Sequence, residues 1–245
     1  MKIMKPDFMK LPIVRITEET SDTKTFQLDR RDYPDFSFLP GQFVIVRAEL
    51  FHPAKNRSTP VNRAFSLSSS PLARDYIEFT AKRYPDGRMT PWLCDQAAAG
   101  DILVVKGPSG EFVFREGETE EIVLVAGGIG AAPYRSMIRY VLARDLPIRI
   151  RLLYSARTPG DFAFKEEFDD LSRKDSRLEC LYTVTREHAG WTGKVGRVDE
   201  TLLRNFLPNA SPLFYLCGPD TMIDTLSGIL KSLGVPDDRI RFERW

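Results

Sequence analysis

Cysteine and histidine are scarce in this chain of 245 residues. There are three cysteines and two histidines, namely Cys94, Cys180, Cys217, His52 and His188. Zinc and iron–sulfur centres need several such ligands at short spacings, and these residues provide no such spacing. An odd number of separated cysteines also fits reduced thiols better than a disulfide framework. The sequence therefore predicts no metal site made from the chain's own ligands.

The sequence also lacks an excess of charged residues of one sign, and it lacks a long apolar run. Lys and Arg number 35 and Asp and Glu number 34, which argues against a general nucleic-acid binder. No apolar run approaches roughly 20 residues, the length that a membrane helix needs, and residues 1–7 lack the apolar core of a secretory signal. We therefore expect no nucleic-acid partner, no membrane span and a cytoplasmic protein. The 42% of hydrophobic residues suffice for one large domain or two small ones.

The first half of the chain has the pattern of short strands separated by turns. Residues 76–82 alternate between apolar and polar side chains, as a half-buried antiparallel strand does. The strands that we expect are 13–18, 23–28, 42–49, 64–68, 76–82 and 101–106. Residues 90–98 resemble a short helix. Segment 51–62 is polar and long for a hairpin, so we predict a solvated loop, with a docking site for a partner as the alternative. So many short strands favour a closed antiparallel β-barrel.

The second half alternates between strands and helices after a charged, turn-prone junction at 115–121. We expect strands at 121–126, 148–154, 179–185 and 213–217. Helices are expected at 131–144, 164–172, 199–206 and 220–233. This alternation predicts a parallel sheet covered by helices, and thus two domains, 1–115 and 116–245.

A glycine-rich turn follows the buried strand at 122–126. Gly127, Gly128 and Gly130 come within four positions, and Pro133 opens a helical pattern. Unpaired N–H groups at a helix N-terminus attract phosphate, and glycines let it reach the backbone. The pattern lacks the spacing of G-x-G-x-x-G and the Lys of a P-loop. A purely structural tight turn therefore stands as the alternative to a nucleotide site.

Weaker motifs precede and follow that turn in a fixed order. In R-x-F-S, an Arg can hold a phosphate, an aromatic ring can pack on a flat ring, and a hydroxyl can bond a ring nitrogen. The set comprises P-G-Q at 40–42, R-x-F-S at 63–66, G-x-x-T at 87–90, G-G-x-G-x-x-P at 127–133, C-G-P-x-x-M at 217–222 and Glu-x-aromatic at 243–245. Together they resemble the ferredoxin–NADP reductase family over residues 11–245, without an iron–sulfur domain.

The resemblance implies an N-terminal flavin-binding β-barrel and a C-terminal Rossmann-like α/β domain that binds NAD(P). In the barrel, Arg63 would bind the flavin pyrophosphate, Phe65 would flank the isoalloxazine ring, and Ser66 would lie near its N5 atom. The other flavin contacts that it implies are Ala64, Thr80, Lys82, Gly87, Arg88, Met89 and Thr90, with backbone N–H groups of 87–90 on the pyrophosphate. FAD is the expected flavin, and FMN stays open.

In the α/β domain, the resemblance places the nicotinamide nucleotide against a second set of residues. These are Gly127, Gly128, Gly130, Pro133, Cys217, Gly218 and Pro219. Cys217 and Glu243 would border the nicotinamide, and Trp245 would cover the flavin, so that Ser66, Cys217, Glu243 and Trp245 form the expected catalytic set. The alternatives are a buried structural Cys217, a solvated Glu243 and a core-packing Trp245. We do not expect a covalent role for Cys217, because no histidine lies near it in sequence.

Three cations follow the second and third predicted parallel strands, namely Arg157, Arg186 and Lys194. Arg suits bidentate contact with phosphate, so the three residues could hold the 2′-phosphate of NADP. Solvated surface charges are the alternative. No acidic residue immediately follows the second strand to hold a 2′-hydroxyl. The pattern favours NADP and leaves NAD open.

These observations predict an NAD(P)H-dependent flavoprotein reductase. It would pass electrons to a separate carrier such as a ferredoxin, a flavodoxin or an oxygenase component. The alternatives are a reductase of free flavin or small acceptors, and a flavin-binding electron-transfer or regulatory subunit with no NAD(P)H reaction of its own. The sequence carries no signal for an oligomer, so a monomer is the default expectation.

Overall fold

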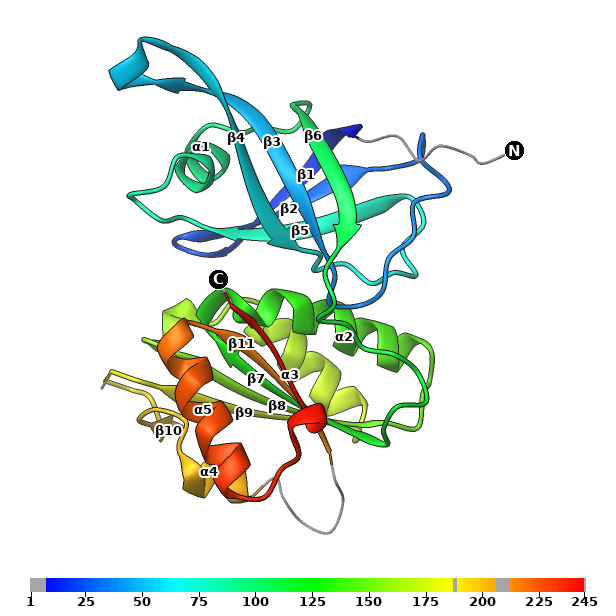
Figure 1. Ribbon diagram of the computed structural model, residues 1–245, viewed down its shortest axis with the longest axis vertical. Coiled ribbons are helices and arrows are strands. Elements are labelled where there is room, and N and C mark those ends of the chain that lie inside the picture. The colour runs from blue at the N-terminus through cyan, green and yellow to red at the C-terminus, as the bar shows by residue number, and fades with distance from the viewer. Residues whose placement is uncertain (1–7, 187–188, 206–211, 245) are drawn as a thin grey trace. The chain divides into compact units, whose positions relative to one another are not determined.

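Two six-stranded sheets account for the β-structure of the computed structural model, one in each of the units Met1–Val113 and Phe114–Trp245 (Figure 1). The structure describes residues 8–186, 189–205 and 212–244. Each unit has its own buried apolar cluster. The two units are therefore described separately.

The sheet of the N-terminal unit is antiparallel and runs in the order β4-β3-β6-β1-β2-β5. Its strands are β1 (Met9–Thr20), β2 (Thr23–Asp29), β3 (Phe43–His52), β4 (Arg57–Ser66), β5 (Tyr76–Lys82) and β6 (Ile102–Ser109). A bridge between Leu67, just after β4, and Phe79 of β5 joins the two ends of the sheet. The predicted antiparallel β-barrel is confirmed.

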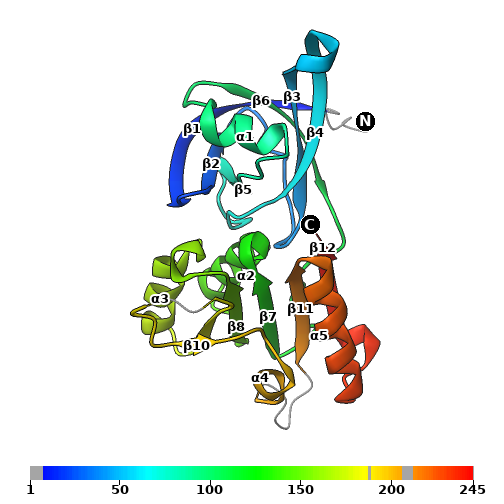
Figure 2. The same cartoon turned by 90° about the vertical axis from the view of Figure 1, so that its left-hand side faces the viewer.

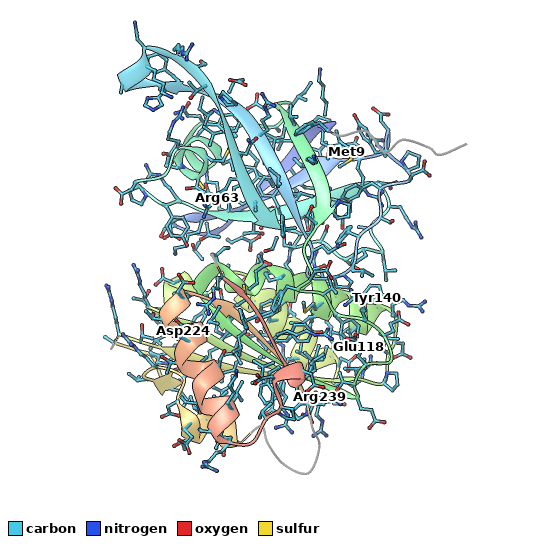
Figure 3. The ribbon with its side chains drawn as sticks, viewed as in Figure 1. Met9, Arg63, Glu118, Tyr140, Asp224 and Arg239 are labelled. Carbon is cyan, nitrogen blue, oxygen red and sulfur yellow. The ribbon has the colours of Figure 1, made fainter. Side chains whose placement is uncertain are left out.

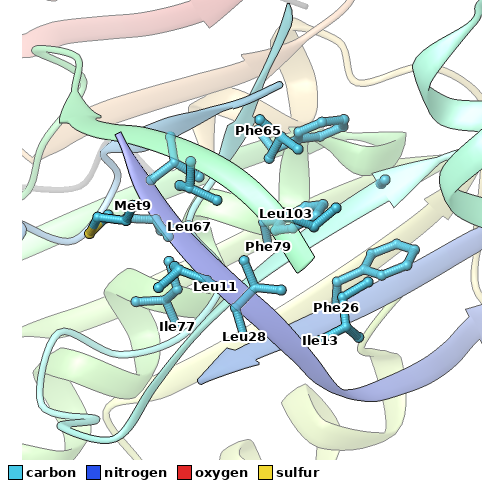
Figure 4. Close-up of a cluster of buried hydrophobic side chains, with 14 of the residues drawn as sticks. Met9, Leu11, Ile13, Phe26, Leu28, Phe65, Leu67, Ile77, Phe79 and Leu103 are labelled. Carbon is cyan, nitrogen blue, oxygen red and sulfur yellow. The ribbon is translucent and has the colours of Figure 1, made fainter. Parts of the chain in front are cut away.

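Alternating apolar side chains of these strands fill the interior of the barrel (Figure 4). The rings of Phe26 and Phe79 stack with centroids 5.2 Å apart, and Phe65 lies 4.9 Å from Phe79. Phe26 and Phe79 are fully buried. Aromatic pairs at such distances add favourable energy beyond the area that they bury, so this cluster holds β2, β4 and β5 together.

The prediction of a solvated loop at 51–62 is wrong. Strands β3 and β4 continue through this segment as a hairpin, paired from Phe43↔Ser66 to His52↔Arg57. A short 3-10 turn, Pro53–Lys55, reverses the chain, and Asn56 has a φ of 48°. The outer part of this ribbon projects from the barrel (Figures 1 and 2). Since it covers no core there, its residues show no apolar alternation that sequence analysis could detect.

Helix α1 (Met89–Asp95) lies beside β4 and β5 in both views of the barrel. It begins one residue before the predicted helix and ends three residues earlier. Leu93 is fully buried, and Met89 and Cys94 are nearly so. These side chains anchor α1 to the barrel.

The C-terminal unit has an all-parallel sheet in the order β10-β9-β8-β7-β11-β12. Its strands are β7 (Glu121–Gly127), β8 (Arg149–Ala156), β9 (Leu178–Val184), β10 (Lys194–Val195), β11 (Leu213–Gly218) and β12 (Ile240–Arg244). Its helices are α2 (Ala131–Ala143), α3 (Lys165–Lys174), α4 (Glu200–Arg204) and α5 (Asp220–Ser232). Helices α4 and α5 cover one face of the sheet, and α2 and α3 cover the other (Figure 1). This confirms the predicted α/β domain.

The strand order changes direction at β7, which has β8 on one side and β11 on the other. In open α/β sheets, ligands bind beyond the carboxyl ends of strands at such a switch point. The glycine turn directly follows β7 as a 3-10 helix, Gly128–Gly130. The topology thus places this turn where a nucleotide site is expected.

Two edge strands were not predicted. Strand β10 has only two residues, and β12 carries polar side chains at three of its five positions. Edge strands need not carry the apolar run that marks an interior parallel strand. Among the described residues, no helix has the length and apolar character needed to cross a lipid bilayer.

Candidate active site

The glycine turn after β7 packs directly against the C-G-P-x-x-M segment after β11. A Cβ added to Gly127 would lie 2.7 Å from the Met222 sulfur, and one added to Gly130 would lie 2.2 Å from the Cys217 carbonyl oxygen. Both distances are far below van der Waals contact. Gly130 is therefore required by this internal packing, because a Cβ there would meet backbone, whereas a Cβ at Gly127 would first meet the flexible Met222 side chain. Sequence analysis attributed both glycines to the approach of a nucleotide, with a structural tight turn as the alternative.

Gly128 differs from the other two glycines of the turn. It is partly exposed, and its φ of 55° lies in the left-handed region that favours glycine. Helix α2 begins three residues later without a side-chain cap and without an acidic residue in its first turn. Uncapped N–H groups at a helix N-terminus suit a phosphate. This end of the turn fits the predicted nucleotide, with Pro133 inside the first turn of α2.

Tyr134 fixes α2 to the two central strands. Its hydroxyl lies 3.1 Å from the carbonyl oxygen of Val125 and 2.7 Å from that of Tyr215. The ring is fully buried, and this burial raises the pKa of the hydroxyl well above its ordinary value. Tyr134 is thus a neutral donor that holds the start of α2 between β7 and β11.

The structure brings Cys217 and Glu243 together. They are registered partners on the parallel strands β11 and β12, so their side chains lie on the same face of the sheet. The Cys217 side chain is almost fully buried. Burial, followed by the charge of Glu243, raises the pKa of this thiol well above its ordinary value. A thiol held in its neutral form suits the expected packing role and not that of a nucleophile.

The three predicted cations lie on neighbouring strand ends. Arg157 follows β8 and Arg186 follows β9, and the Arg186 N–H donates to the Arg157 carbonyl oxygen at 3.0 Å. Lys194 lies on β10, paired with Thr183 of β9. All three side chains are exposed. The fold therefore gathers these cations at the carboxyl edge of the sheet, as a 2′-phosphate site requires.

In the barrel, Arg63 extends from β4 (Figure 3). Its side chain is exposed, and within the described part of the chain no carboxylate forms an ion pair with it. Ala64 is also exposed, and Ser66 at the end of β4 is half-buried. An exposed arginine without an ion-pair partner fits a ligand that carries phosphate.

The G-x-x-T segment lies at the start of α1. Gly87 is exposed, whereas Met89 and Thr90 are buried. The Thr90 hydroxyl accepts a hydrogen bond from the Tyr84 N–H at 3.1 Å, which shapes the turn before the helix. The predicted pyrophosphate contacts are the N–H groups of 87–90. The Gly87 N–H donates to the Tyr84 carbonyl oxygen at 2.9 Å, whereas the first N–H groups of a helix have no partner within the helix, so those of 88–90 stay predicted contacts.

Four side chains that the resemblance implies as flavin contacts are buried or already contact other groups of the protein. Phe65 pairs with Val44 across the hairpin and points into the core, where it is 7% exposed. The Thr80 hydroxyl is buried within 2.9 Å of those of Thr25 and Ser68. Lys82 forms an ion pair with Asp22 at 2.7 Å. Arg88 donates to the Leu50 carbonyl oxygen on β3 at 2.6 Å and to the Thr59 hydroxyl on β4 at 3.1 Å. Strand alternation turns Phe65 and Thr80 inward and leaves them little surface for a ligand.

The P-G-Q motif has a structural explanation. The Gln42 side chain accepts a hydrogen bond from the Leu39 N–H at 2.9 Å and donates to the Gly110 carbonyl oxygen at 3.3 Å. A Cβ on Gly110 would lie 2.9 Å from the ring of Phe43. The motif thus joins the start of β3 to the end of β6.

Trp245, the predicted cover of the flavin, lies outside the described residues. The strand that leads to it is held by Arg244, which donates to Asp224 at 2.7 Å and to Asp220 at 3.3 Å, both on α5. Sequence analysis missed Tyr134 and Met222 as site residues. The spacing within C-G-P-x-x-M could have indicated Met222, but no local signal marks Tyr134, because one of its two partners, Tyr215, lies 81 residues away on β11.

Both halves of the chain match known domain models. Residues 10–114 match the oxidoreductase FAD-binding domain, and residues 124–227 match the oxidoreductase NAD-binding domain. Together with the barrel and the switch-point turn, these matches define a flavoprotein oxidoreductase module. A flavoprotein oxidoreductase needs a pyrophosphate contact and a nucleotide site. Arg63 fits the first, and the N-terminus of α2 fits the second.

Curated relatives identify the family, and a solved structure has the same fold. The chain is 32% identical to ferredoxin–NAD(P)+ reductase CarAd of Metapseudomonas resinovorans over 96% of this chain and 68% of that protein. It is 31% identical to the glycine betaine monooxygenase reductase subunit of Chromohalobacter salexigens, over 90% of this chain and 60% of that protein. The ferredoxin NADP+ reductase of Neisseria gonorrhoeae has the same fold, with a TM-score of 0.79, 22% identity and coverage of 98% and 99%. The chain belongs to the ferredoxin–NADP reductase family.

The chain spans about 60% of the length of several of these curated relatives. Their names include reductase subunits of monooxygenases and flavohemoproteins. The two shared domains are thus combined with further sequence in those proteins.

Proposed function

We propose that this protein takes hydride from NADPH onto FAD and passes the electrons to a separate carrier protein. The observation that carries the proposal is that two matched domains occur in one chain, and that the motif residues of each lie on neighbouring elements of its fold. In the barrel these are Arg63, Ser66 and residues 87–90, and in the α/β unit they are the glycine turn with Cys217 and Glu243. The names of several relatives, as reductase components of oxygenases or as ferredoxin reductases, support the same reaction.

FAD can accept a hydride and release its two electrons one at a time. The residues of this chain supply binding and orientation. Arg63 and the N–H groups of 88–90 would bind the flavin pyrophosphate, and the hydroxyl of Ser66 would orient the ring. Cys217 would pack as a neutral thiol against the nicotinamide. Hydride transfer depends mainly on such positioning and on the exclusion of water.

Nucleotide preference is assigned to the exposed cations at the carboxyl edge of the sheet. Arg157, Arg186 and Lys194 would contact the 2′-phosphate of NADP, which NAD lacks. The crystal structure of the Neisseria gonorrhoeae reductase contains bound FAD and NADP, and the structure of the human Ncb5or domains is an NAD+ form, so both nucleotides are tested below.

The deciding measurement is an anaerobic absorbance titration of the purified protein with NADPH and with NADH. We expect bound flavin to lose its absorbance promptly, and faster with NADPH. A flavin spectrum that neither nucleotide changes would favour an electron-transfer or regulatory subunit. Absence of flavin, even after reconstitution with FAD and FMN, would contradict the proposal.

The variant Arg186→Ala tests the preference for NADP separately from the ability to accept hydride. Loss of a charge-assisted phosphate contact should lower the efficiency with NADPH about tenfold or more and leave that with NADH nearly unchanged. Arg173→Ala, which removes an exposed arginine on α3, is the control. An unchanged NADPH-to-NADH ratio in Arg186→Ala would remove Arg186 from the 2′-phosphate site.

Reduction of a carrier is tested by mixing the reduced protein with a plant-type [2Fe–2S] ferredoxin, with a flavodoxin and with free FMN. We expect faster electron transfer to at least one protein carrier than to free FMN. Faster reduction of free FMN would favour the small-acceptor alternative.

A further inference from the structure

The indole of Trp191 closes a tight turn, the β10 turn (residues 191–194), which leads into β10. Its Nε1 donates to the Lys194 carbonyl oxygen at 2.9 Å. A Cβ added to Gly193 would lie 2.5 Å from the indole ring, so a side chain there would displace the indole. Trp191 therefore holds the backbone of Lys194, whose exposed side chain is one of the three cations at the carboxyl edge of the sheet.

The same indole packs against Phe162. The two rings are stacked with an interplanar angle of 29° and centroids 5.7 Å apart. Phe162 is only 5% exposed, and it makes edge contacts with Tyr154 on β8 and Tyr182 on β9, at 5.0 and 5.2 Å. Aromatic contacts of this kind add favourable energy beyond the area that they bury. The cluster thus holds Trp191 against β8 and β9.

Phe162 also ends the β8 loop, residues 157–162, which begins with the predicted phosphate contact Arg157. Within this loop, the Thr158 N–H and hydroxyl donate to the Asp161 carboxylate at 2.9 and 2.8 Å. These hydrogen bonds form the capping box of a 3-10 turn and so determine the path of the loop. The stack of Phe162 on the indole therefore joins the β8 loop to the β10 turn.

Strand β10 is held at both of its ends. It has two residues, both exposed, at the edge of the sheet (Figure 1). The Thr183 hydroxyl of β9 donates to the Gly196 carbonyl oxygen just after the strand, at 2.7 Å, and Trp191 holds its start. So short a strand gains little from its own pairing to offset the entropy of ordering it. The position of Lys194 therefore depends on these contacts.

We propose that Trp191 is a positioning residue for the 2′-phosphate site. It acts through Lys194 and makes no contact of its own with the phosphate. The stack on Phe162 and the hydrogen bond to the Lys194 backbone keep this lysine next to the loop of Arg157. Cations that are already in place bind a phosphate more tightly, because less conformational freedom is lost on binding. The inference rests on the proposed nucleotide site and adds an aromatic support that sequence analysis did not single out.

The test is a double-mutant cycle on the complete protein, with calorimetric titration of adenosine 2′,5′-bisphosphate. Lys194→Ala and Trp191→Leu should each raise its Kd about five- to tenfold. The double variant should bind it no more weakly than Lys194→Ala alone, because the indole acts through the lysine. Adenosine 5′-monophosphate, which lacks the 2′-phosphate, should bind all variants within about twofold of the unaltered protein. Lys174→Ala removes an exposed lysine on α3 and should change neither Kd.

Trp191→Phe keeps a ring on Phe162 and removes the N–H, so it should raise the Kd for the bisphosphate about two- to threefold. Full additivity of Trp191→Leu and Lys194→Ala would overturn the inference, and so would equal weakening of both nucleotides by Trp191→Leu. If Trp191→Leu does not fold, Trp191→Phe takes its place in the cycle. If the unaltered protein binds the bisphosphate no more tightly than the monophosphate, the proposed 2′-phosphate site itself is contradicted, and this inference with it.

Discussion

At the scale of single residues, the glycine turn after β7 packs closely against the segment after β11 because glycine has no Cβ. Gly130 has no room for a Cβ, because the Cys217 carbonyl oxygen occupies that position. The contact connects the segment after β7 with the segment after β11. A glycine is therefore required here by the neighbouring strand, even without a ligand.

Gly130→Ala should lower the free energy of unfolding by about 1–3 kcal/mol, because a clash with backbone cannot be relieved by a rotamer change. Urea unfolding measures this change. Gly228→Ala is the matched control. It lies in α5, and a Cβ there meets nothing within 4 Å, so alanine should add about 0.5–1 kcal/mol through its higher helix propensity. Equal effects of the two substitutions would contradict the packing argument.

Arg63 is the residue on which flavin retention should depend most. Arg63→Ala removes an exposed guanidinium, and we expect about 10- to 100-fold weaker flavin binding, the cost of a charge-assisted phosphate contact. The flavin-to-protein absorbance ratio after purification measures this loss. Arg74→Ala, an exposed arginine elsewhere in the barrel unit, should keep the full ratio. Full flavin content in Arg63→Ala would place the pyrophosphate elsewhere.

At the scale of elements, α2 and α3 are joined through one carboxylate. Arg135 donates to Glu167 at 2.8 Å and Arg139 donates to it at 2.5 and 2.9 Å. Burial raises the pKa of Glu167, but hydrogen bonds and charge from Arg139 and Arg135 outweigh burial and lower it below the ordinary 4.5. Because the folded pKa is depressed, this stabilisation is present above pH 4.5 and is lost as the pH falls through the folded value.

Glu167→Gln should lower the free energy of unfolding at pH 7 by about 1–3 kcal/mol, since two half-buried or buried arginines lose their partner. The difference from the unaltered protein should shrink as the pH falls below 4.5. Chemical unfolding at several pH values measures both effects. Glu166→Gln changes the exposed neighbour on α3 and should stay within about 0.5 kcal/mol. A difference that stays constant with pH would exclude the ion pairs as its cause.

At the scale of the whole molecule, each unit carries its own sheet, core and predicted ligand. A ligand that binds the folded state protects the structure around it. FAD should slow amide exchange most in β4 and at the start of α1. NADP+ should slow it most after β7, β8 and β9. Exchange followed by mass spectrometry checks this, and FAD protection confined to the α/β unit would contradict the assignment of the barrel.

The sequence by itself determined most of the elements. Interior parallel strands such as β7 are continuous apolar runs, and β5 alternates apolar and polar residues in sequence, so local pattern was sufficient to predict both strands. The expectation that β5 is half-buried is wrong, because Glu78 and Thr80 on its polar side are buried as well. The ordered motifs also determined the family. The hairpin at 51–62 and strands β10 and β12 were missed, because elements that cover little core carry no periodic signal.

Only the tertiary structure decided which residues meet. Tyr134 reaches carbonyl oxygens on two strands, Gly130 contacts Cys217, and Cys217 pairs with Glu243. Phe65 and Thr80 turned inward, and Arg88 joined the hairpin. These contacts connect segments far apart in the chain. They depend on strand order and register, which local side-chain preferences do not specify.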